Sequence, residues 1–397
     1  MIKVAFIGTK NFPIPNIRGG AIETLVTGII DENEKKNQLD LSVFTIESDG
    51  LDEYVKRYQH TRFFKIDSPN LWLRMKIFVW RALRRLTNYR IPYKDYFMMS
   101  VNRLLKQNHF DIIIYENEAT DMMQAKRYKG TKNLMHIHAD YITADMPGVR
   151  WLCQHCDYVI GVSDFITNRM EKIPYLEGKG RTLKNAIDLT SFSEDINDEI
   201  TTEFRESLGL SKDDIVVLYC GRLSKEKGCL ELIKAVERVP HVKLVVVGGD
   251  NFSSNKRTEY VEQLLAEAKT IGDRIVFTGH VNHSDVGKYY AAADIGVVPS
   301  ICYEAASLTI LEYRASGLPT IASRMGGIPE YCNDNTTLLV EYNNTFIENL
   351  AIAIQKLVDS KELRSRLSNS SHMGLKEYGY DAYFDNFVQL INEIYYE

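Results

Sequence analysis

The chain has 397 residues, of which 45% are hydrophobic and 25% charged, so we expect a globular protein of two or three domains. Its net charge of −5 argues against a nucleic-acid-binding role, and its six scattered cysteines argue against a disulfide framework. The chain contains no run of about 18 apolar residues, so no membrane-spanning helix is predicted. Strand-like sequence begins at Met1, so we expect a cytoplasmic protein without a signal peptide.

Short apolar runs alternate with helix-like segments through the first half of the chain. Such runs are typical of strands that are covered on both faces of a parallel sheet. An amphipathic helix is predicted from Ala21 to about Lys35. The runs that we interpret as buried strands are residues 3–7, 41–46, 111–115, 133–137 and 158–161.

The loop Gly8–Gly20 follows the first predicted strand. Gly19 and Gly20 would let the backbone approach a ligand closely, and the helix that begins after them would favour a phosphate group. These two glycines are therefore candidate ligand-binding residues. The alternative is an ordinary loop between a strand and a helix.

Residues 74–106 form a basic stretch with nine Lys or Arg and one acid, Asp95. On helices, this stretch would give basic amphipathic surfaces that suit an anionic membrane. The alternative, which the sequence leaves equally open, is a solvated pair of helices with its aromatic side chains in the core. The interleaved apolar residues are Trp72, Phe78, Trp80, Leu83, Leu86, Tyr89 and Tyr93.

Two histidines lie at the end of the predicted strand 133–137. His136 and His138 share one face of a strand, where both could be buried, and a lone histidine there would more often be structural.

A separate pair, Cys153 and Cys156, forms a C-x-x-C in a predicted helix, with no second C-x-x-C in the chain. We interpret this pair as two semi-buried thiols rather than as a zinc or redox site.

The strand pattern restarts at residues 215–219, after a polar stretch at 188–198 that we interpret as a linker. The chain is therefore predicted to be an α/β protein with two Rossmann-like, doubly wound domains that face a central cleft. We assign residues 1–190 to the first domain, 191–375 to the second, and 376–397 to a helix that packs back on the first. The later strands of the second series are residues 242–247, 274–277, 294–298, 320–322 and 338–340.

Two charged residues follow the strand 215–219, at the sheet edge where open parallel sheets bind ligands. Arg222 offers a planar fork for phosphate and Lys227 offers a point charge, both near the start of the next helix. A solvated charged turn is the alternative for this segment.

The next two strands also end in candidate ligand-binding segments. Gly248 and Gly249 would allow close approach of a ligand to the backbone. Backbone groups at His280 and Val281 could contact the edge of a nucleobase. Each segment taken alone is equally compatible with an ordinary turn.

A pair of glutamates with seven residues between them follows the strand 294–298. The free N–H groups of Ser307, Leu308 and Thr309, at the start of a helix, would face a diphosphate, and Glu304 and Glu312 would accept hydrogen bonds from hydroxyl groups. The alternative is a helix with one exposed glutamate and an acid before its first turn, which the helix dipole favours.

With the Ala-Ser-Gly-Leu-Pro run that follows it, this pair resembles the E-x7-E signature of retaining glycosyltransferases with the GT-B fold, family 4 type. The resemblance spans essentially the whole chain and is strongest from Asn185 to Val340. Ala186 replaces a glycine that is usual in the family. Residues 247–250, 277–281 and 326–330 also match the family in order and spacing.

The resemblance implies roles for the candidate residues of the second domain. Arg222 and Lys227 match the pair that binds the donor phosphates in this family. Glu304 is implied to bind the sugar and Glu312 the ribose of the donor. Residues 248–249, 280–281 and 307–309 are implied to complete the donor site.

The resemblance also implies roles in the first domain. His138 matches a histidine that lies close to the transferred sugar, with His136 as the weaker candidate. Gly19 and Gly20 match a loop that faces the donor phosphates and the acceptor. Ser163 resembles a further position in the cleft.

The implied activity is transfer of a hexose-type sugar from a nucleotide-diphosphate sugar, without a cofactor. We expect a UDP-sugar, although no residue of the motifs distinguishes UDP from GDP. The implied acceptor is a lipid-linked intermediate of capsule or exopolysaccharide synthesis, at the inner face of the cell membrane. The sequence contains no Asp-x-Asp, which agrees with a metal-independent donor site. The resemblance implies a front-face retaining mechanism. Two alternatives remain, namely a nucleotide-sugar 2-epimerase of the same fold and a non-catalytic coat or surface assembly protein.

Overall fold

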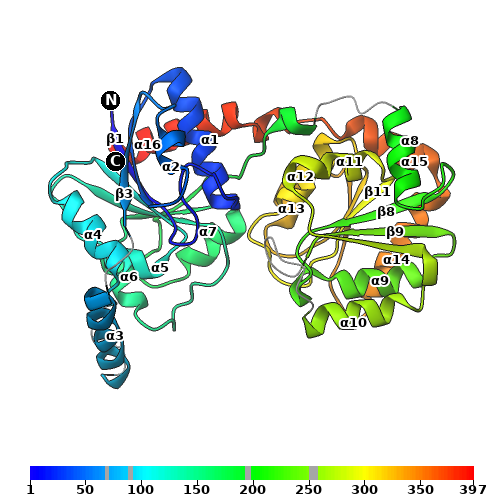
Figure 1. Cartoon of the computed structure of the whole chain (residues 1–397), viewed down its shortest axis with the longest axis horizontal. Coiled ribbons are helices and arrows are strands. Elements are labelled where there is room, and N and C mark those ends of the chain that lie inside the picture. The colour runs from blue at the N-terminus through cyan, green and yellow to red at the C-terminus, as the bar shows by residue number, and fades with distance from the viewer. Residues whose placement is uncertain (68–70, 88–92, 193–197, 250–257) are drawn as a thin grey trace. The chain divides into compact units, whose positions relative to one another are not determined.

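The computed structural model describes residues 1–67, 71–87, 93–192, 198–249 and 258–397 (Figure 1). The chain forms two compact units, one made of Met1–Ala186 with Tyr380–Glu397 and the other of Ile187–Gly379. Some predicted features lie outside the described residues, namely Tyr89 and Arg90 of the basic stretch, Asp250 of the second domain and residues 193–197 of the expected linker.

A seven-stranded parallel sheet forms the middle of the first unit, in the order β3-β2-β1-β4-β5-β6-β7. The five runs predicted as buried strands are confirmed as its central members. The two strands that were not predicted lie at the sheet edges, where β3 carries exposed Arg62 and Lys65 and β7 has only three residues. The strands are β1 Lys3–Ile7, β2 Asp40–Ile46, β3 Thr61–Ile66, β4 Ile112–Glu116, β5 Lys132–Ile137, β6 Tyr158–Gly161 and β7 Gly180–Thr182. The helices before residue 187 are α1 Ala21–Lys36, α2 Leu51–Val55, α3 Leu71–Leu86, α4 Tyr96–Leu105, α5 Ala119–Met122, α6 Val149–His155 and α7 Asp164–Glu171.

The C-terminal helix α16, Tyr380–Tyr396, belongs to the first unit and packs on α1. Its Phe387 stacks on Phe6 of β1, with ring centroids 5.6 Å apart, and both rings are buried. Lys36 of α1 lies 2.6 Å from Asp385 of α16. Full burial of a phenylalanine is worth roughly 1.5–3 kcal/mol, so α16 contributes substantially to the stability of this unit.

A six-stranded parallel sheet forms the middle of the second unit, in the order β10-β9-β8-β11-β12-β13. Val217 of β8 belongs to the apolar cluster on one face of the sheet and Val216 to the cluster on the other, as side-chain alternation requires. The strands are β8 Ile215–Cys220, β9 Val242–Val247, β10 Ile275–Gly279, β11 Ile295–Val298, β12 Thr320–Ser323 and β13 Thr337–Val340. The helices are α8 Asp198–Ser207, α9 Cys229–Glu237, α10 Glu259–Ala268, α11 Val286–Ala291, α12 Leu308–Ala315, α13 Ile328–Tyr331, α14 Phe346–Asp359 and α15 Lys361–Ser370. The 3-10 turns are η1 Leu189–Phe192, η2 Lys225–Lys227, η3 Gly272–Arg274, η4 His283–Asp285 and η5 Leu375–Tyr378.

The strand order of the second sheet changes direction at β8. Successive strands first run outward from β8 to β9 and β10, and the chain then returns to the other side of β8 with β11. The loops after β8 and β11 therefore leave the sheet in opposite directions. Open α/β sheets bind ligands at such a switch point, beyond the carboxyl ends of the strands. Both units thus have the predicted Rossmann-like fold.

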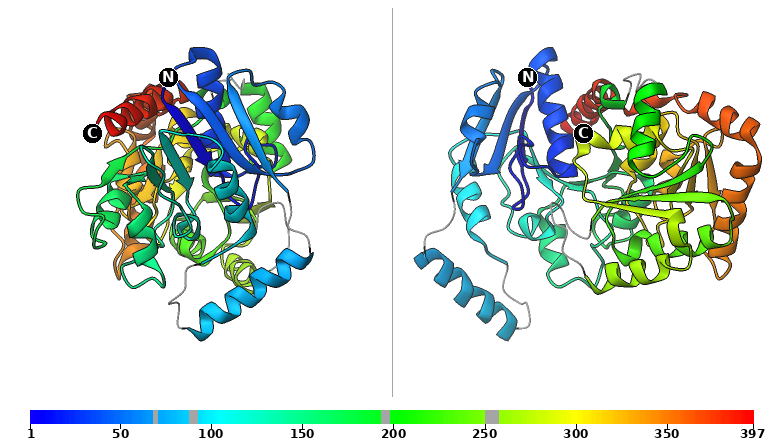
Figure 2. Two further views of the ribbon diagram at one scale, coloured as in Figure 1. Left: turned by 90° about the vertical axis from the view of Figure 1, so that its left-hand side faces the viewer. Right: turned by 45° about the vertical axis from the view of Figure 1, so that its right-hand side comes forward.

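Helix α3 projects from the body of the first unit (Figure 2). Its Trp72 and Phe78 are 64% and 74% exposed, whereas Ile77 is buried. The alternative in which the aromatic side chains of the basic stretch lie in the core is therefore wrong for these two residues. α4 behaves differently, since its Phe97 is fully buried.

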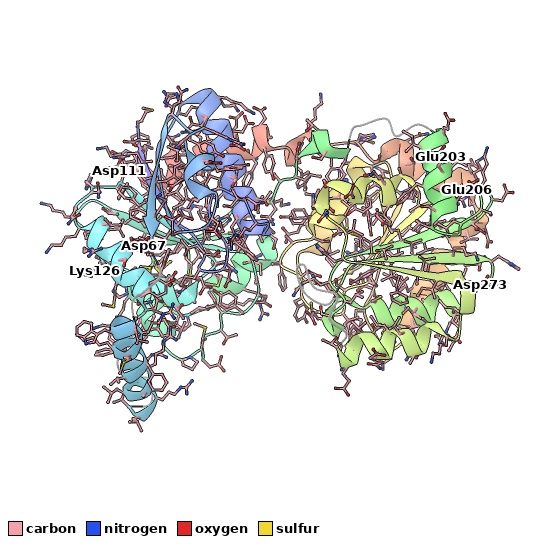
Figure 3. The ribbon with its side chains drawn as sticks, in the orientation of Figure 1. Asp67, Asp111, Lys126, Glu203, Glu206 and Asp273 are labelled. Atoms are coloured by element: carbon pink, nitrogen blue, oxygen red, sulfur yellow. The ribbon has the colours of Figure 1, made fainter. Side chains whose placement is uncertain are left out.

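Asp67, Lys126, Glu203 and Asp273 are examples of charged side chains that lie exposed on the two units (Figure 3). None of the helices in the described ranges has both the length and the apolar composition needed to cross a membrane.

The C-x-x-C pair lies on α6 and just after it, and its thiols are more deeply buried than predicted. Cys153 and Cys156 are both free and buried. Burial raises the pKa of the Cys156 thiol to about 12, so it stays protonated and unreactive at neutral pH. This setting agrees with a structural role for the pair.

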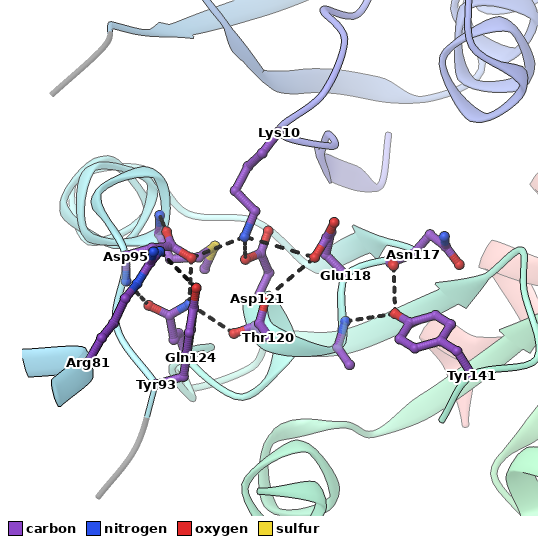
Figure 4. A network of polar contacts seen from close by, with 12 residues as sticks. Lys10, Arg81, Tyr93, Asp95, Asn117, Glu118, Thr120, Asp121, Gln124 and Tyr141 are labelled. Carbon is purple, nitrogen blue, oxygen red and sulfur yellow. Dashed lines mark hydrogen bonds and ion pairs between the residues drawn. The ribbon is translucent and has the colours of Figure 1, made fainter. Parts of the chain in front are cut away.

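A buried ion-pair network ties the loop after β1 to α4 and α5 (Figure 4). Lys10 Nζ lies 2.6 Å from Asp121 Oδ1 and 3.0 Å from Asp95 Oδ2, and Asp95 also caps α4 by accepting from the Met98 N–H. Burial raises the pKa of Asp121 to about 7, against the opposing charge of Lys10. The network fixes the start of the loop that carries Gly19 and Gly20.

Candidate functional site

The structure brings Lys227 and Glu304 together at the switch point of the second sheet. Lys227 lies in the loop after β8 and Glu304 in the loop after β11, and their Nζ and Oε1 atoms are 2.6 Å apart. Ser300 Oγ donates to the same carboxylate oxygen at 2.5 Å. The side chains of Lys227 and Glu304 are 25% and 10% exposed, so a cation and an acid are held in a partly desolvated place. Such a pair can contact both a phosphate group and a hydroxyl group.

Close approach between loops positions this pair. Gly228 has φ 71°, and a Cβ there would lie 1.9 Å from the Pro299 carbonyl oxygen, so only glycine lets the loops after β8 and β11 touch. A Cβ at Gly326, which has φ 60°, would lie 2.3 Å from the Glu304 carbonyl oxygen, and the Gly327 N–H donates to that carbonyl at 2.7 Å. The glycine pair after β12 therefore supports Glu304.

Arg222 lies in the same loop as Lys227 but is half exposed. Its Nη2 is 4.0 Å from the Glu226 carboxylate, and its carbonyl accepts from the Tyr219 hydroxyl at 2.6 Å. The backbone of Arg222 is thus fixed while its guanidinium extends into solvent. The structure does not bring Arg222 into the Lys227–Glu304 pair.

Glu312 is buried on the second turn of α12, with partners that the sequence did not indicate. The Tyr290 hydroxyl donates to Oε2 at 2.6 Å, and His283 Nε2 lies 3.1 Å from Oε1. The hydrogen bond and charge of Glu312 raise the pKa of His283. Neither partner belongs to a recognisable motif, and only the fold places η4 and α11 beside α12.

The predicted backbone contacts occupy the same edge of the second sheet. Ser307 is the N-cap of α12, and Leu308 and Thr309 begin the helix, where N–H groups lack partners within the helix. Gly248 and Gly249 follow β9, and the Gly249 carbonyl accepts from the Leu223 N–H at 2.9 Å. The structure therefore gives the glycine pair a role in holding the loop after β8.

The end of β10 completes the predicted set in the second unit. His280 is exposed and Val281 is partly buried, directly after the strand. They lie two strands away from β8, because β9 separates β10 from β8.

The other predicted residues belong to the first unit. Gly19 and Gly20 both have positive φ and lie just before α1. His136 is buried within β5, and His138, just after the strand, has a side chain that is 7% exposed. Both rings face Glu116, a residue that the sequence interpretation missed. Ser163 is the N-cap of α7, which gives it a structural role.

Two family models match consecutive parts of the chain. Residues 35–191 match the model described as Glycosyltransferase Family 4, and residues 200–372 match the model described as Glycosyl transferases group 1. The first match lies within the first unit apart from its last residues, and the second lies within the second unit.

Two relatives match over most of their length. The chain is 26% identical over 384 residues to Spore coat protein SA of Bacillus subtilis (strain 168), which covers 93% of both chains. It is 26% identical over 342 residues to the lipopolysaccharide 1,2-N-acetylglucosaminetransferase of Salmonella typhimurium, which covers 84% of both chains.

Solved structures share the fold over nearly the whole chain. Anabaena Alr3699/HepE in complex with UDP has a TM-score of 0.74 at 16% identity, and covers 99% of this chain and 100% of its own. A glycosyltransferase from Rickettsia africae has a TM-score of 0.74 at 19% identity, with 99% and 97% coverage. With this fold and the two family matches, the chain is a GT-B glycosyltransferase that combines a Glycosyltransferase Family 4 domain with a Glycosyl transferases group 1 domain.

Proposed function

We propose that the chain transfers a hexose-type sugar, with retention of its anomeric configuration, from a nucleotide-diphosphate sugar to an acceptor hydroxyl. The observation that carries this proposal is the Lys227–Glu304 pair at the switch point, just before the N-terminus of α12. The fold likeness to Alr3699/HepE, whose structures contain UDP and UDP-glucose, supports a UDP-sugar as the donor.

The proposed step exchanges one bond at the anomeric carbon. The acceptor oxygen bonds to this carbon, the bond from the carbon to the diphosphate oxygen breaks, and the departing phosphate oxygen takes the acceptor proton. Lys227, Arg222 and the first N–H groups of α12 stabilise the charge that grows on the diphosphate. These fixed cations supply the positive charge that a metal held by Asp-x-Asp would otherwise bring to the diphosphate, and the sequence has no Asp-x-Asp. The donor site is therefore proposed to work without a metal.

The acidic residues are proposed to bind hydroxyl groups of the donor. A carboxylate has about four acceptor positions. Ser300 and Lys227 use one oxygen of Glu304, which leaves acceptor capacity for the sugar. Glu312 is proposed to bind the ribose, and His138 to lie near the transferred sugar, as the family resemblance implies.

Calorimetric titration with a panel of nucleotides tests the proposal. One nucleoside diphosphate, UDP on our proposal, is expected to bind with one-to-one stoichiometry. It should bind at least about tenfold more tightly than its monophosphate, or about 1.4 kcal/mol, because the second phosphate adds charge for Lys227 and Arg222. Absence of binding to every nucleotide, or equal affinity for UDP and UMP, would contradict the proposed donor site.

We further propose a lipid-linked acceptor of cell-surface polysaccharide synthesis, reached when α3 docks on an anionic membrane. The lipopolysaccharide activity in the name of the Salmonella relative supports this class of acceptor. Exposed Trp72 and Phe78 suit the boundary between lipid head groups and acyl chains. The basic residues of α3 are Arg74, Lys76, Arg81, Arg84 and Arg85. Each basic residue close to an anionic leaflet contributes about 1 kcal/mol.

Vesicle flotation tests the docking. The protein is expected to float with vesicles that contain phosphatidylglycerol and to stay in solution with neutral vesicles. Replacing Arg81, Arg84 and Arg85 by glutamine should reduce the recovery severalfold, as should replacing Trp72 and Phe78 by serine. A matched control replaces three exposed lysines of the second unit, Lys212, Lys269 and Lys361, and should float like the wild type. The docking would be refuted if the protein were recovered equally with neutral and anionic vesicles and if the changes in α3 left that recovery unaltered.

A second candidate function is assembly into a coat without catalysis. The name of the Bacillus relative, Spore coat protein SA, favours it. The ordered contacts of Lys227 and Glu304 favour catalysis instead, since a purely architectural protein has no need of a partly buried pair of opposite charges at a ligand-binding edge.

A further inference from the structure

A separate cluster of donor atoms lies in the first unit, at the carboxyl ends of β4 and β5. Glu116 ends β4 and is paired in register with His136 of β5, and His138 follows on the same side of the chain. His136 Nδ1 and His138 Nε2 each lie 3.1 Å from Glu116 Oε2 and 3.2 Å from one another. In the part of the chain that the structure describes, this is the one group of three His, Cys, Asp or Glu side chains with such close ligand atoms.

Protons alone cannot satisfy all three contacts of this triangle. An imidazole nitrogen has a single in-plane position, which holds either a hydrogen or a lone pair, and a carboxylate only accepts. If both nitrogens donate to Glu116, two N–H groups face each other across 3.2 Å. If either nitrogen is bare, its lone pair faces the carboxylate oxygen across 3.1 Å. One contact is repulsive in either arrangement, and burial makes that repulsion costly.

A cation at the centre removes the conflict, because each of the three atoms then directs a lone pair at it. Zinc binds histidine and carboxylate ligands at about 2.0 Å in a tetrahedron, which sets neighbouring ligand atoms about 3.3 Å apart. The observed separations of 3.1–3.2 Å come within a few tenths of an ångström of this value. We propose that Glu116, His136 and His138 bind a divalent transition-metal cation, with Zn²⁺ as the ion that fits the donor set.

The backbone that carries these side chains is held in place. Asn117, in the left-handed region at φ 50°, donates its N–H to the His136 carbonyl at 2.8 Å, and its Oδ1 accepts from the His138 N–H at 2.8 Å. The Tyr141 hydroxyl donates to the Asn117 carbonyl at 2.6 Å. Ligands on a fixed backbone lose little conformational entropy on binding an ion.

The three ligands belong to the first unit, whereas the Lys227–Glu304 pair, which is proposed to act on the donor without a metal, belongs to the second. A cation bound to Nε2 would fix the ring orientation of His138. The ion would then position the His138 ring in the first unit and would not act on the diphosphate.

Direct measurement of bound metal tests the proposal without any nucleotide. The full chain is stripped with a chelator, equilibrated with one equivalent of Zn²⁺ and separated from free ion, and zinc is counted by elemental mass spectrometry. The wild type is expected to retain about one zinc per chain. Glu116→Gln and His136→Gln should weaken binding by more than about 100-fold, because even changes to residues behind the ligands cost roughly 10–100-fold.

Two controls keep the result specific. His109→Gln, which changes an exposed histidine of the same unit, should bind zinc like the wild type. Cobalt(II) bound to the wild type should give the visible absorption of a tetrahedral nitrogen–oxygen site without a near-ultraviolet thiolate band, which excludes the cysteines. Retention of less than about a tenth of an equivalent by the wild type, unchanged affinity in both folded ligand variants, or a thiolate band would each overturn the proposal.

Discussion

Replacing Lys227 by alanine is expected to lower the rate of sugar transfer by about 10²–10³-fold, because removing one preorganised donor to developing charge costs that much in enzymes. The ammonium group is held 2.6 Å from Glu304 before a donor arrives, so no reorganisation is needed when charge grows on the diphosphate. The fold should be retained, since the side chain is partly exposed and contributes nothing to the apolar core. Steady-state kinetics with circular dichroism measure the two effects.

Lys225 offers a matched control for this change. It lies on the same 3-10 turn, two residues earlier, and is exposed. Lys225→Ala should therefore keep its activity within about twofold of the wild type, as surface changes away from specific contacts usually do. A folded Lys227→Ala or Arg222→Ala variant with unchanged turnover would contradict the assignment of these cations to the diphosphate.

Replacing Glu304 by alanine is expected to separate sugar transfer from nucleotide binding. Turnover should fall by at least about 10²-fold, because the proposed contact with the sugar hydroxyls is lost. Affinity for the nucleoside diphosphate should stay the same or increase, because the change removes a negative charge 2.6 Å from Lys227. Kinetics and calorimetry on the same preparation measure the two quantities.

Glu237, an exposed residue at the end of α9, provides the control for this second change. Glu237→Ala should leave both quantities unaltered. Diphosphate affinity that falls in parallel with turnover in Glu304→Ala would place Glu304 in support of the phosphate site rather than of the sugar.

Much of the fold could be predicted because the central strands are short, continuous apolar runs. Strands such as β1 and β8 are buried on both faces, and this burial leaves a local signal in the sequence. β3 and β7 lack this signal, since an edge strand needs only partial burial. β3 contains charged residues and β7 is only three residues long. The order of the strands, and hence the switch point, depends on pairing between distant segments.

The candidate site shows the same division between local and distant information. The loops that carry Lys227 and Glu304 were predicted, because each follows a strand of one sheet. Two partner residues were not predicted, namely Tyr290, which donates to Glu312, and Glu116, which contacts the two histidines. Each comes from an element that only the fold brings beside the residue it contacts. Amphipathic periodicity alone likewise could not decide whether the apolar face of α3 is buried or exposed.

Product mass spectrometry distinguishes sugar transfer from the two alternative functions. The protein is incubated with a nucleotide-diphosphate sugar and a lipid extract that contains polyprenyl-diphosphate-linked acceptors. We expect an acceptor heavier by one sugar residue together with released nucleoside diphosphate, and loss of both products in Lys227→Ala but not in Lys225→Ala. A donor converted to an isomer of equal mass, which chromatography separates from the original donor before mass detection, would instead indicate an epimerase. No change in any component, with a donor that binds, would indicate a non-catalytic protein. Either result would contradict the proposed sugar transfer.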